Sequence, residues 1–132
     1  MTEQVMTIRE MCETFGVTAR TLRFYEAKEL LSPIREGQKR LFTKRDRARL
    51  KLILRGKRFG FSLEDIRQLL DLYEMGDHGT TQLREVHAKA KTRLAEMIAQ
   101  RDEMNTAIEE LQAQLDWGAE KLAEQDQIKK AG

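Results

Sequence analysis

The sequence predicts a mainly α fold, in which a winged helix-turn-helix domain is followed by one long coiled-coil helix. Three observations support this prediction. Ser or Thr residues precede four segments of helical periodicity, where a hydroxyl group can cap backbone N–H groups. A glycine-containing stretch between the second and third segments has the pattern of a hairpin. Beyond residue 80, apolar residues recur every seven positions.

The size of the chain corresponds to about one domain, or to a small domain with one additional element. It has 132 residues, of which 40% are hydrophobic and 35% are charged. Its single cysteine cannot form an internal disulfide, and no Cys/His cluster has the spacing of a zinc or iron–sulfur site. No apolar run reaches the roughly 20 residues that span a bilayer, and the first residues do not resemble a signal peptide. We therefore expect a cytoplasmic protein.

The first helix is expected to begin at a capping box and to end at a glycine. Thr7 and Glu10 have the spacing of that box, and the apolar stripe that follows reaches Phe15. Gly16 can adopt the left-handed conformation that ends a helix. Thr18 then begins a second helix. Two helices joined by a short glycine turn form a helix-turn-helix pattern.

The second helix is expected to run to Leu31, because Pro33 disfavours helical backbone in the residue before it. Residues 34–42 leave no room for another helix before the next cap. They instead contain two short flanks around Gly37, which predicts a small hairpin, or wing.

Two further helices complete the N-terminal domain. Thr43, with Asp46 three residues later, begins a third helix that is expected to reach Phe59. Ser62 repeats the capping signal and begins a fourth helix toward Met75.

The seven-residue repeat beyond residue 80 predicts a coiled coil, because eight of its ten seam positions are apolar. The d positions are Leu83, Ala90, Met97, Met104 and Leu111, and the a positions are His87, Leu94, Arg101, Ile108 and Leu115. The N-terminal domain is too small to offer this seam much surface to pack against. We therefore expect a second copy of the chain to cover it. The alternative is a long helix that packs on its own N-terminal domain.

These elements divide the chain into four predicted segments. Residues 1–75 form the winged helix-turn-helix domain, residues 76–79 a linker, residues 80–117 the dimerisation helix and residues 118–132 a short polar tail. The tail is expected because Trp117 and Gly118 interrupt the repeat, and it has room for one more helical turn around Leu122.

Charge is distributed unevenly along the chain. Residues 1–61 carry 15 Lys/Arg and 7 Asp/Glu, a net charge of +8, while residues 62–132 carry a net charge of −6. The excess is largest between Arg35 and Arg58, where 11 basic residues accompany two acidic ones. This pattern is typical of a surface that faces phosphate, although charge alone fits a solvated face equally well.

The sequence carries no pattern of an enzyme, a cofactor site or a metal site. His78 and His87 are nine residues apart, with no neighbouring cysteine. Cys12 completes the apolar stripe of the first helix and is expected to be a core residue rather than a sensor thiol. The common phosphate-binding glycine motifs are absent. As polar seam residues, His87 and Arg101 can fix the register of the coil.

A basic helix-turn-helix can lay its second helix in the major groove of DNA. The candidates for contacts with base edges are Thr18, Arg20, Arg23 and Phe24. The candidates for phosphate contacts are Arg35, Lys39 and Arg40 in the wing, and Arg55, Lys57 and Arg58 at the end of the third helix. Pairing through the coil would present two such domains to an inverted repeat.

Several segments resemble the MerR family of bacterial transcriptional regulators, in the same order and spacing. Residues 17–26, VTARTLRFYE, resemble the recognition helix of the family. Residues 30–33 resemble the turn that follows it, and residues 40–43 resemble the end of the wing. Residues 60–66, GFSLEDI, are similar to the segment that opens the fourth helix. The long final helix resembles the antiparallel dimerisation coil of the family.

The resemblance implies a homodimer that binds an inverted repeat in a promoter spacer and distorts the DNA, so that RNA polymerase can engage both promoter elements. It assigns DNA-binding roles to Arg23, Phe24, Tyr25, Arg35 and Arg40, with Tyr25 as the signature aromatic of the recognition helix. Two positions depart from the family pattern. Lys39 stands where many members have an aromatic wing residue, and Phe42 replaces the more usual tyrosine.

The effector implied by the resemblance is a small-molecule metabolite rather than a metal. Metal-sensing members bind their ion through cysteines near the coil, where this sequence has no thiol. It resembles instead the short members, some of which respond to metabolites. Two other functions stay open: a sequence-nonspecific architectural DNA-binding protein, and a coiled-coil adaptor whose basic domain docks on an acidic protein.

Overall fold

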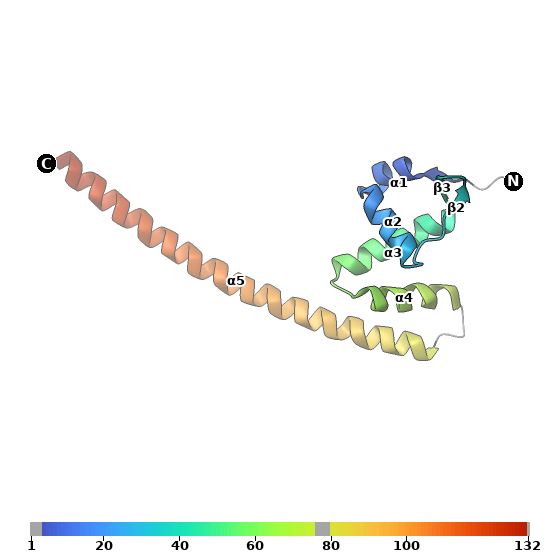
Figure 1. Ribbon diagram of the computed structural model, residues 1–132. Helices are drawn as coiled ribbons and strands as arrows, with labels where there is room; N and C mark the ends of the chain where they lie inside the picture. Colours follow the sequence, from blue (N-terminus) through green and yellow to red (C-terminus); the bar gives the residue numbers. More distant parts are fainter. Residues whose placement is uncertain (1–3, 76–79, 132) are drawn as a thin grey trace. The chain divides into compact units, whose positions relative to one another are not determined.

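The structure, a computed structural model, describes residues 4–75 and 80–131 (Figure 1). Its elements, in chain order, are β1 (Met6–Thr7), α1 (Ile8–Phe15), α2 (Ala19–Ala27), β2 (Ile34–Glu36), β3 (Lys39–Phe42), α3 (Lys44–Arg58), α4 (Leu63–Met75) and α5 (Thr80–Ala131). They form two compact units, an N-terminal unit of residues 1–87 and a C-terminal unit of residues 88–132.

The capping residues predicted for α1 and α2 are present. Thr7 Oγ1 accepts a hydrogen bond from the N–H of Glu10 (3.2 Å), and the Glu10 carboxylate accepts one from the N–H of Thr7 (3.0 Å). Gly16 ends α1 with a φ of 66°, which glycine adopts without steric cost. Thr18 Oγ1 accepts from the N–H of Thr21 (3.1 Å) and so caps α2. The predicted helix-turn-helix is confirmed.

The predicted end of α2 at Leu31 is wrong, since the helix ends at Ala27. Glu29 takes a left-handed φ of 62°, and the N–H groups of Leu30 and Leu31 both donate to the carbonyl of Tyr25. This turn brings both leucines into the core, at 0% and 1% exposure. The restriction that proline imposes reaches only the preceding residue, so it does not set the end of this helix.

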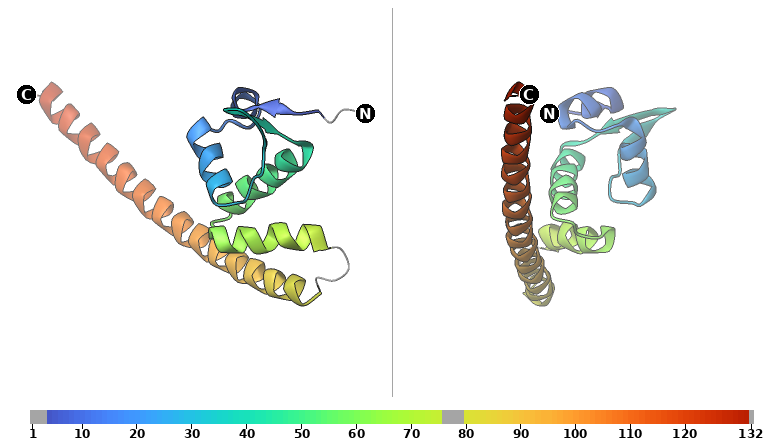
Figure 2. Two further views of the ribbon diagram at one scale, coloured as in Figure 1. Left: turned by 45° about the vertical axis from the view of Figure 1, so that its right-hand side comes forward. Right: turned by 90° about the vertical axis from the view of Figure 1, so that its left-hand side faces the viewer.

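The predicted hairpin over residues 34–42 is confirmed and forms the wing. β2 and β3 pair in antiparallel fashion, with Arg35 opposite Arg40 and with Gly37 (φ 60°) in the turn. An unpredicted strand, β1, pairs with the other edge of β3, so the strand order is β1-β3-β2 (Figure 2). A strand of two residues carries too little alternation to be recognised in a sequence.

The core of the N-terminal unit is formed by α1 to α4, β3 and the loop after α2. Its buried residues are Met11, Leu22, Tyr25, Leu30, Leu31, Phe42, Leu50, Ile53, Ile66 and Leu70. Cys12 is partly buried against this core. Ser62 Oγ accepts from the N–H of Asp65 (3.1 Å) and so caps α4 as predicted. α3 and α4 approach closely at Gly56, where a Cβ atom would lie 2.8 Å from Ile66 Cγ1.

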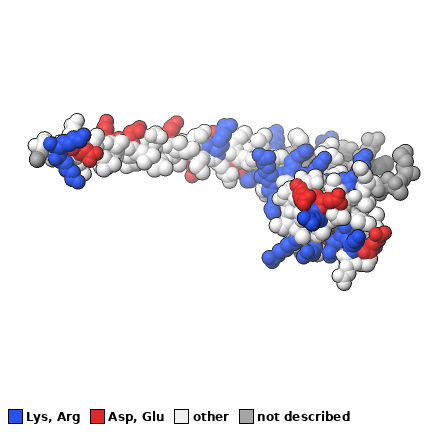
Figure 3. Space-filling view, turned by 90° about the horizontal axis from the view of Figure 1, so that it is seen from above, with Lys and Arg blue, Asp and Glu red and all other residues white. Residues whose placement is uncertain are grey.

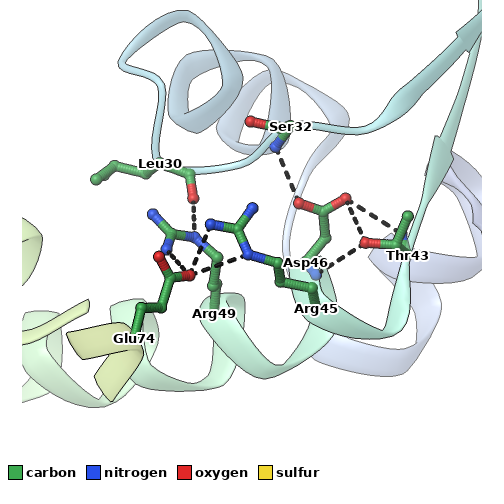
Figure 4. Close-up of polar contacts among 7 residues, drawn as sticks. All are labelled: Leu30, Ser32, Thr43, Arg45, Asp46, Arg49 and Glu74. Atoms are coloured by element: carbon green, nitrogen blue, oxygen red, sulfur yellow. Dashed lines mark hydrogen bonds and ion pairs between the residues drawn. The ribbon is translucent and has the colours of Figure 1, made fainter. Parts of the chain in front are cut away.

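Two charged residues of α3 hold the loop between α2 and β2 in place (Figure 4). The Asp46 carboxylate, at 1% exposure, accepts hydrogen bonds from the N–H groups of Ser32 (2.9 Å) and Thr43 (3.1 Å). Arg49 Nε donates to the carbonyl of Leu30 at 2.7 Å. These bonds fix the connection between the recognition helix and the wing.

Replacing the buried carboxylate is expected to destabilise the N-terminal unit. Asp46→Ala leaves two backbone N–H groups without their acceptor and weakens the cap of α3, so the free energy of unfolding should fall by about 2 kcal/mol. Urea denaturation followed by circular dichroism measures this change. The matched control is Asp71→Ala, at an exposed position of α4, which should change stability by less than about 0.5 kcal/mol. Equal effects of the two substitutions would contradict this account.

α5 runs without interruption from Thr80 to Ala131 (Figure 2). The predicted helix end at Trp117 and Gly118 is therefore wrong, and the predicted tail over residues 118–132 is helical as far as Ala131. One glycine costs a helix only about 1 kcal/mol relative to alanine, and good helix formers such as Ala, Glu and Lys follow it.

The predicted segment boundaries around residues 75–80 stay predictions. The predicted linker, residues 76–79, and His78 within it lie outside the described residues. The division between the two compact units falls after His87, within α5. Within residues 4–75 and 80–131, no helix is long and apolar enough to cross a membrane.

Candidate nucleic-acid interface

The base-contact candidates lie on the exposed face of α2. Arg20, Arg23 and Phe24 have the i, i+3, i+4 spacing of one helix face, and all three are exposed, as is Thr18 at the N-cap. Phe24 is 44% exposed, and the Lys28 ammonium lies 5.7 Å from the centre of its ring. Arginines can pair with the edge of guanine, and an exposed ring can contact a thymine methyl group. The geometry of this face suits the major groove.

Tyr25 faces the core, so the structure contradicts the DNA-contact role assigned to it. Its side chain is 3% exposed, and its ring lies 5.7 Å from that of Phe24. Leu22, three residues earlier on the same helix face, is fully buried. Phe42 is also fully buried, so its departure from the family pattern affects the core. The Tyr25 side chain therefore packs in the core and anchors the recognition helix to it.

The wing arginines contact the recognition helix. Arg40 Nε donates to Glu26 Oε1 at 2.6 Å, and Arg35 Nη1 lies 3.2 Å from Glu26 Oε2. Lys39, at the start of β3, is exposed. Burial raises the pKa of Glu26, but the hydrogen bonds and charges of Arg40 and Arg35 outweigh this effect, so the pKa lies below its usual 4.5.

The third group of basic candidates lies in the last turn of α3, where Arg55, Lys57 and Arg58 are all exposed. Cations at a helix C-terminus are favourable because the helix dipole is negative there. A hollow of about 410 Å³ lies between this turn, the start of α4 and α2. Its lining residues are Arg20, Thr21, Phe24, Tyr25, Lys57, Phe61, Leu63 and Ile66. One surface thus joins the end of α3 to the recognition helix.

On the face of the N-terminal unit that Figure 3 shows, basic side chains cover more of the surface than acidic ones. A smaller group of acidic side chains lies among them. α2, the wing and the end of α3 each contribute cations, and cations of this kind are able to contact phosphates. The fold therefore brings the predicted contact residues together, with the exception of Tyr25.

An ion-pair cluster at the end of α4 is expected to make stability depend on pH (Figure 4). Glu74 Oε1 accepts from Arg45 Nη2 at 2.6 Å and from Arg49 Nη1 at 2.7 Å. Burial raises the pKa of Glu74, but these hydrogen bonds outweigh it and place the pKa below its usual 4.5. A lowered native pKa stabilises the folded state above the unfolded value, and this contribution disappears as pH falls through the native pKa.

Glu74→Gln is accordingly expected to flatten the dependence of stability on pH below about 4.5. Urea denaturation at pH 7 and pH 3 measures it for the wild type and the variant. Glu64→Gln is the control, since Glu64 lies on the same helix and its side chain is 70% exposed. If stability falls between pH 7 and pH 3 by the same amount in Glu74→Gln as in the wild type, this role of the cluster is contradicted.

The predicted seam of the coil is open in the single chain. Seven apolar seam residues of α5 are 36% to 62% exposed: Leu83, Leu94, Met97, Met104, Ile108, Leu111 and Leu115. His87 and Arg101 are exposed, and Ala90 is partly exposed. Leu122, 64% exposed, continues the a position one heptad beyond Leu115. The interruption at Gly118 hid this continuation in the sequence.

Sequence reasoning missed the residues that hold the contact surface together. Glu26, Asp46 and Glu74 bridge elements that are 9 to 29 residues apart in the chain. Two of them have a local signal: Asp46 completes the capping box of α3, and Glu26 directly follows the aromatic pair of the recognition helix. Within the described part of the chain, no three His, Cys, Asp or Glu side chains gather in a metal-binding group.

Comparisons with known proteins agree with this geometry. The family model described as MerR HTH family regulatory protein matches residues 6–72, and the model described as MerR, DNA binding matches residues 47–114. The HTH-type transcriptional regulator HmrR of Rhizobium leguminosarum bv. viciae is 33% identical over 107 residues, which cover 80% of this chain and 83% of HmrR.

Two solved structures resemble this one. HiNmlR, a MerR family regulator lacking the sensor domain and solved bound to promoter DNA, has a TM-score of 0.62 and 27% identity, covering 76% of this chain and 77% of its own. PbrR691 of Ralstonia metallidurans CH34, a transcription regulator solved in complex with lead(II), has a TM-score of 0.57 and 31% identity. The match covers 75% of this chain and 82% of PbrR691.

Proposed function

Because this chain belongs to the MerR family of helix-turn-helix regulators and is a DNA-binding transcription regulator rather than an enzyme, we propose that it binds an inverted repeat as a homodimer. The observation that carries the proposal is the exposed face of α2, flanked by the basic wing and the basic end of α3. HiNmlR, which has a similar fold, was solved bound to promoter DNA, and this supports DNA binding by the present chain. We also propose that it acts in the cytoplasm.

The homodimer is supported by the open seam of α5. Leu94, Ile108 and Leu115 are each more than half exposed in the single chain, and they recur at heptad positions. A mostly apolar stripe of this length is stable in water when another helix covers it. Two copies paired in antiparallel orientation would place one DNA-binding domain at each end of the coil. A two-fold arrangement matches an operator with two-fold symmetry.

We propose that the target lies in the spacer of a promoter and that binding distorts the DNA, so that RNA polymerase engages both promoter elements. Candidate phosphate-contact residues in the wing and at the end of α3 support this idea, because a protein that holds the DNA backbone at several points can bend it. The energy of such deformation depends on sequence, and it contributes specificity at bases that the protein does not touch.

We propose a small-molecule metabolite, rather than a metal ion, as the effector. The only cysteine of the sequence, Cys12, packs against the core of the N-terminal unit, and zinc, copper and lead sites generally need several thiolate or imidazole ligands. Adding zinc, copper(I) or lead(II) to the protein–operator complex should leave operator affinity and transcription unchanged. A stoichiometric metal-dependent change in either would contradict this proposal.

The experiment that tests the function is selection of bound fragments from a bacterial genomic library, followed by footprinting of the fragments retained. An inverted repeat within an overlong promoter spacer is the expected result, and it would also identify the regulated genes. Fragments without a common sequence, whose binding disappears as salt rises, would favour the architectural alternative. Retention of no DNA at physiological salt would favour the adaptor.

A further inference from the structure

A single carboxylate on the recognition helix receives both wing arginines. Glu26 lies in the last turn of α2, and its Oε1 accepts from Arg40 Nε at 2.6 Å. Arg35 Nη1 lies 3.3 Å from Oε1 and 3.2 Å from Oε2 of the same carboxylate. Because Arg35 and Arg40 are opposite each other in the β2–β3 ladder, Glu26 joins both strands of the wing to α2.

The inner of these two ion pairs is sheltered from solvent. The Arg40 and Glu26 side chains are 22% and 21% exposed, whereas Arg35 is 49% exposed. Exposed pairs hold geometry weakly, because water screens them and long side chains lose entropy on pairing. Short hydrogen bonds between charged groups are stronger and more directional. The ion pair between Glu26 and Arg40 is therefore the stronger of the two, and the ion pair with Arg35 adds to it.

Apolar packing does little to fix the outer strand of the wing. All three residues of β2 are exposed, including Ile34 at 47%. The buried anchor of the hairpin is Phe42, at the far end of β3 from the turn. The position of β2 relative to α2 thus depends mainly on polar contacts, of which those to Glu26 are direct.

The negative charge of Glu26 is unfavourable on a surface that binds DNA. A carboxylate beside two phosphate-contact candidates lowers the local positive potential and so opposes DNA binding. Its pKa, lowered by the wing arginines despite burial, keeps it ionised at neutral pH. A negative charge at this place is explained if Glu26 has a geometric role whose benefit to DNA binding exceeds its electrostatic cost.

We propose that Glu26 is a positioning residue, which sets the wing at the distance and angle from the recognition helix that lets Arg35 and Arg40 reach phosphate while α2 lies in the groove. The proposal rests on the proposed function, since it assumes specific DNA binding. Arg40, held most tightly, orients the hairpin, and the more exposed Arg35 shares its remaining donors with the DNA backbone.

The electrostatic role and the positioning role of Glu26 predict changes of opposite sign in operator affinity. Glu26→Gln removes a negative charge, so electrostatics alone predicts tighter operator binding and a steeper dependence on salt. The positioning role predicts that affinity falls by about tenfold and that the slope of log affinity against log salt decreases by about 1, as for the loss of one phosphate contact. Fluorescence anisotropy of the selected operator, from about 50 to 200 mM salt, measures both quantities.

Two control variants separate position from charge. Glu36→Gln removes the same charge from an exposed position of the wing and is expected to bind DNA as tightly as the wild type or tighter. Glu26→Asp keeps the charge but moves the carboxylate back by one methylene group. A charge-only role predicts wild-type affinity for Glu26→Asp, whereas the positioning role predicts weaker binding than the wild type.

Each outcome decides between the two roles. If Glu26→Gln resembles Glu36→Gln, the positioning role is overturned while the proposed function stands. If the wild type itself does not prefer its selected operator to random DNA, the proposed function has failed instead. Thermal melting verifies that the variants are folded at the assay temperature. Should Glu26→Gln be unfolded there, Glu26→Asp decides, since wild-type affinity for it would overturn the proposal.

Discussion

Leu94→Asp combined with Ile108→Asp is expected to give a monomer that binds operator DNA at least about 100-fold more weakly than the wild type. Both residues occupy a positions of the seam, and each is 56% exposed in the single chain. In a dimer the substitution places four unpaired carboxylates in an apolar interface, where each charge costs several kcal/mol. Loss of pairing also removes the gain in affinity that comes from linking two half-site contacts.

Light scattering measures the mass of the double variant, and anisotropy measures its affinity for the operator. Thr92→Asp combined with Thr106→Asp is the matched control, because these positions lie on the face of α5 opposite the seam and are exposed. The control should remain dimeric and keep its affinity within a few fold. An unchanged dimeric mass in the seam variant would contradict the assignment of the interface.

The second large effect is expected at the recognition helix. Arg23→Ala should relax discrimination at one or two base pairs of each half-site by about 1–3 kcal/mol, or roughly 5- to 150-fold in affinity ratio. Arg23 lies on the exposed face of α2 with Arg20 and Phe24, where its guanidinium can pair with a guanine edge. Competition between the operator and single-base variants of it measures the change.

Arg58→Ala is the control for Arg23→Ala, because it removes the same charge from the last turn of α3. It should weaken binding to all sequences about equally and reduce the salt slope by about 1. An equal loss on operator and random DNA for Arg23→Ala would refute the assignment of Arg23 to base readout.

Local chemistry made most of the N-terminal unit predictable from the sequence. Thr7, Thr18, Thr43 and Ser62 all act as caps, because a cap needs only a hydroxyl group within three residues of the backbone group that it satisfies. The glycine turn of the wing follows from similarly local signals. The resemblance then identified the arrangement of these elements as that of a known family.

Features that depend on distant residues were not predictable in this way. The helix end at Ala27 accompanies the burial of two successive leucines, and Tyr25 belongs to a core to which α3 and α4 also contribute residues. The contacts of Glu26 and Glu74 join elements whose separation leaves no periodic signal. The continuation of α5 through Gly118 shows the opposite error, in which a local signal was given too much weight.

The most direct test of the central claim is the ratio of affinities for the selected operator and for a random duplex of the same length, measured at about 150 mM salt. A sequence-specific dimeric regulator predicts a ratio of at least about 1,000, with protection of two half-sites related by a two-fold axis. A ratio below about 10, with both affinities falling equally as salt rises, would contradict the claim and leave only backbone binding.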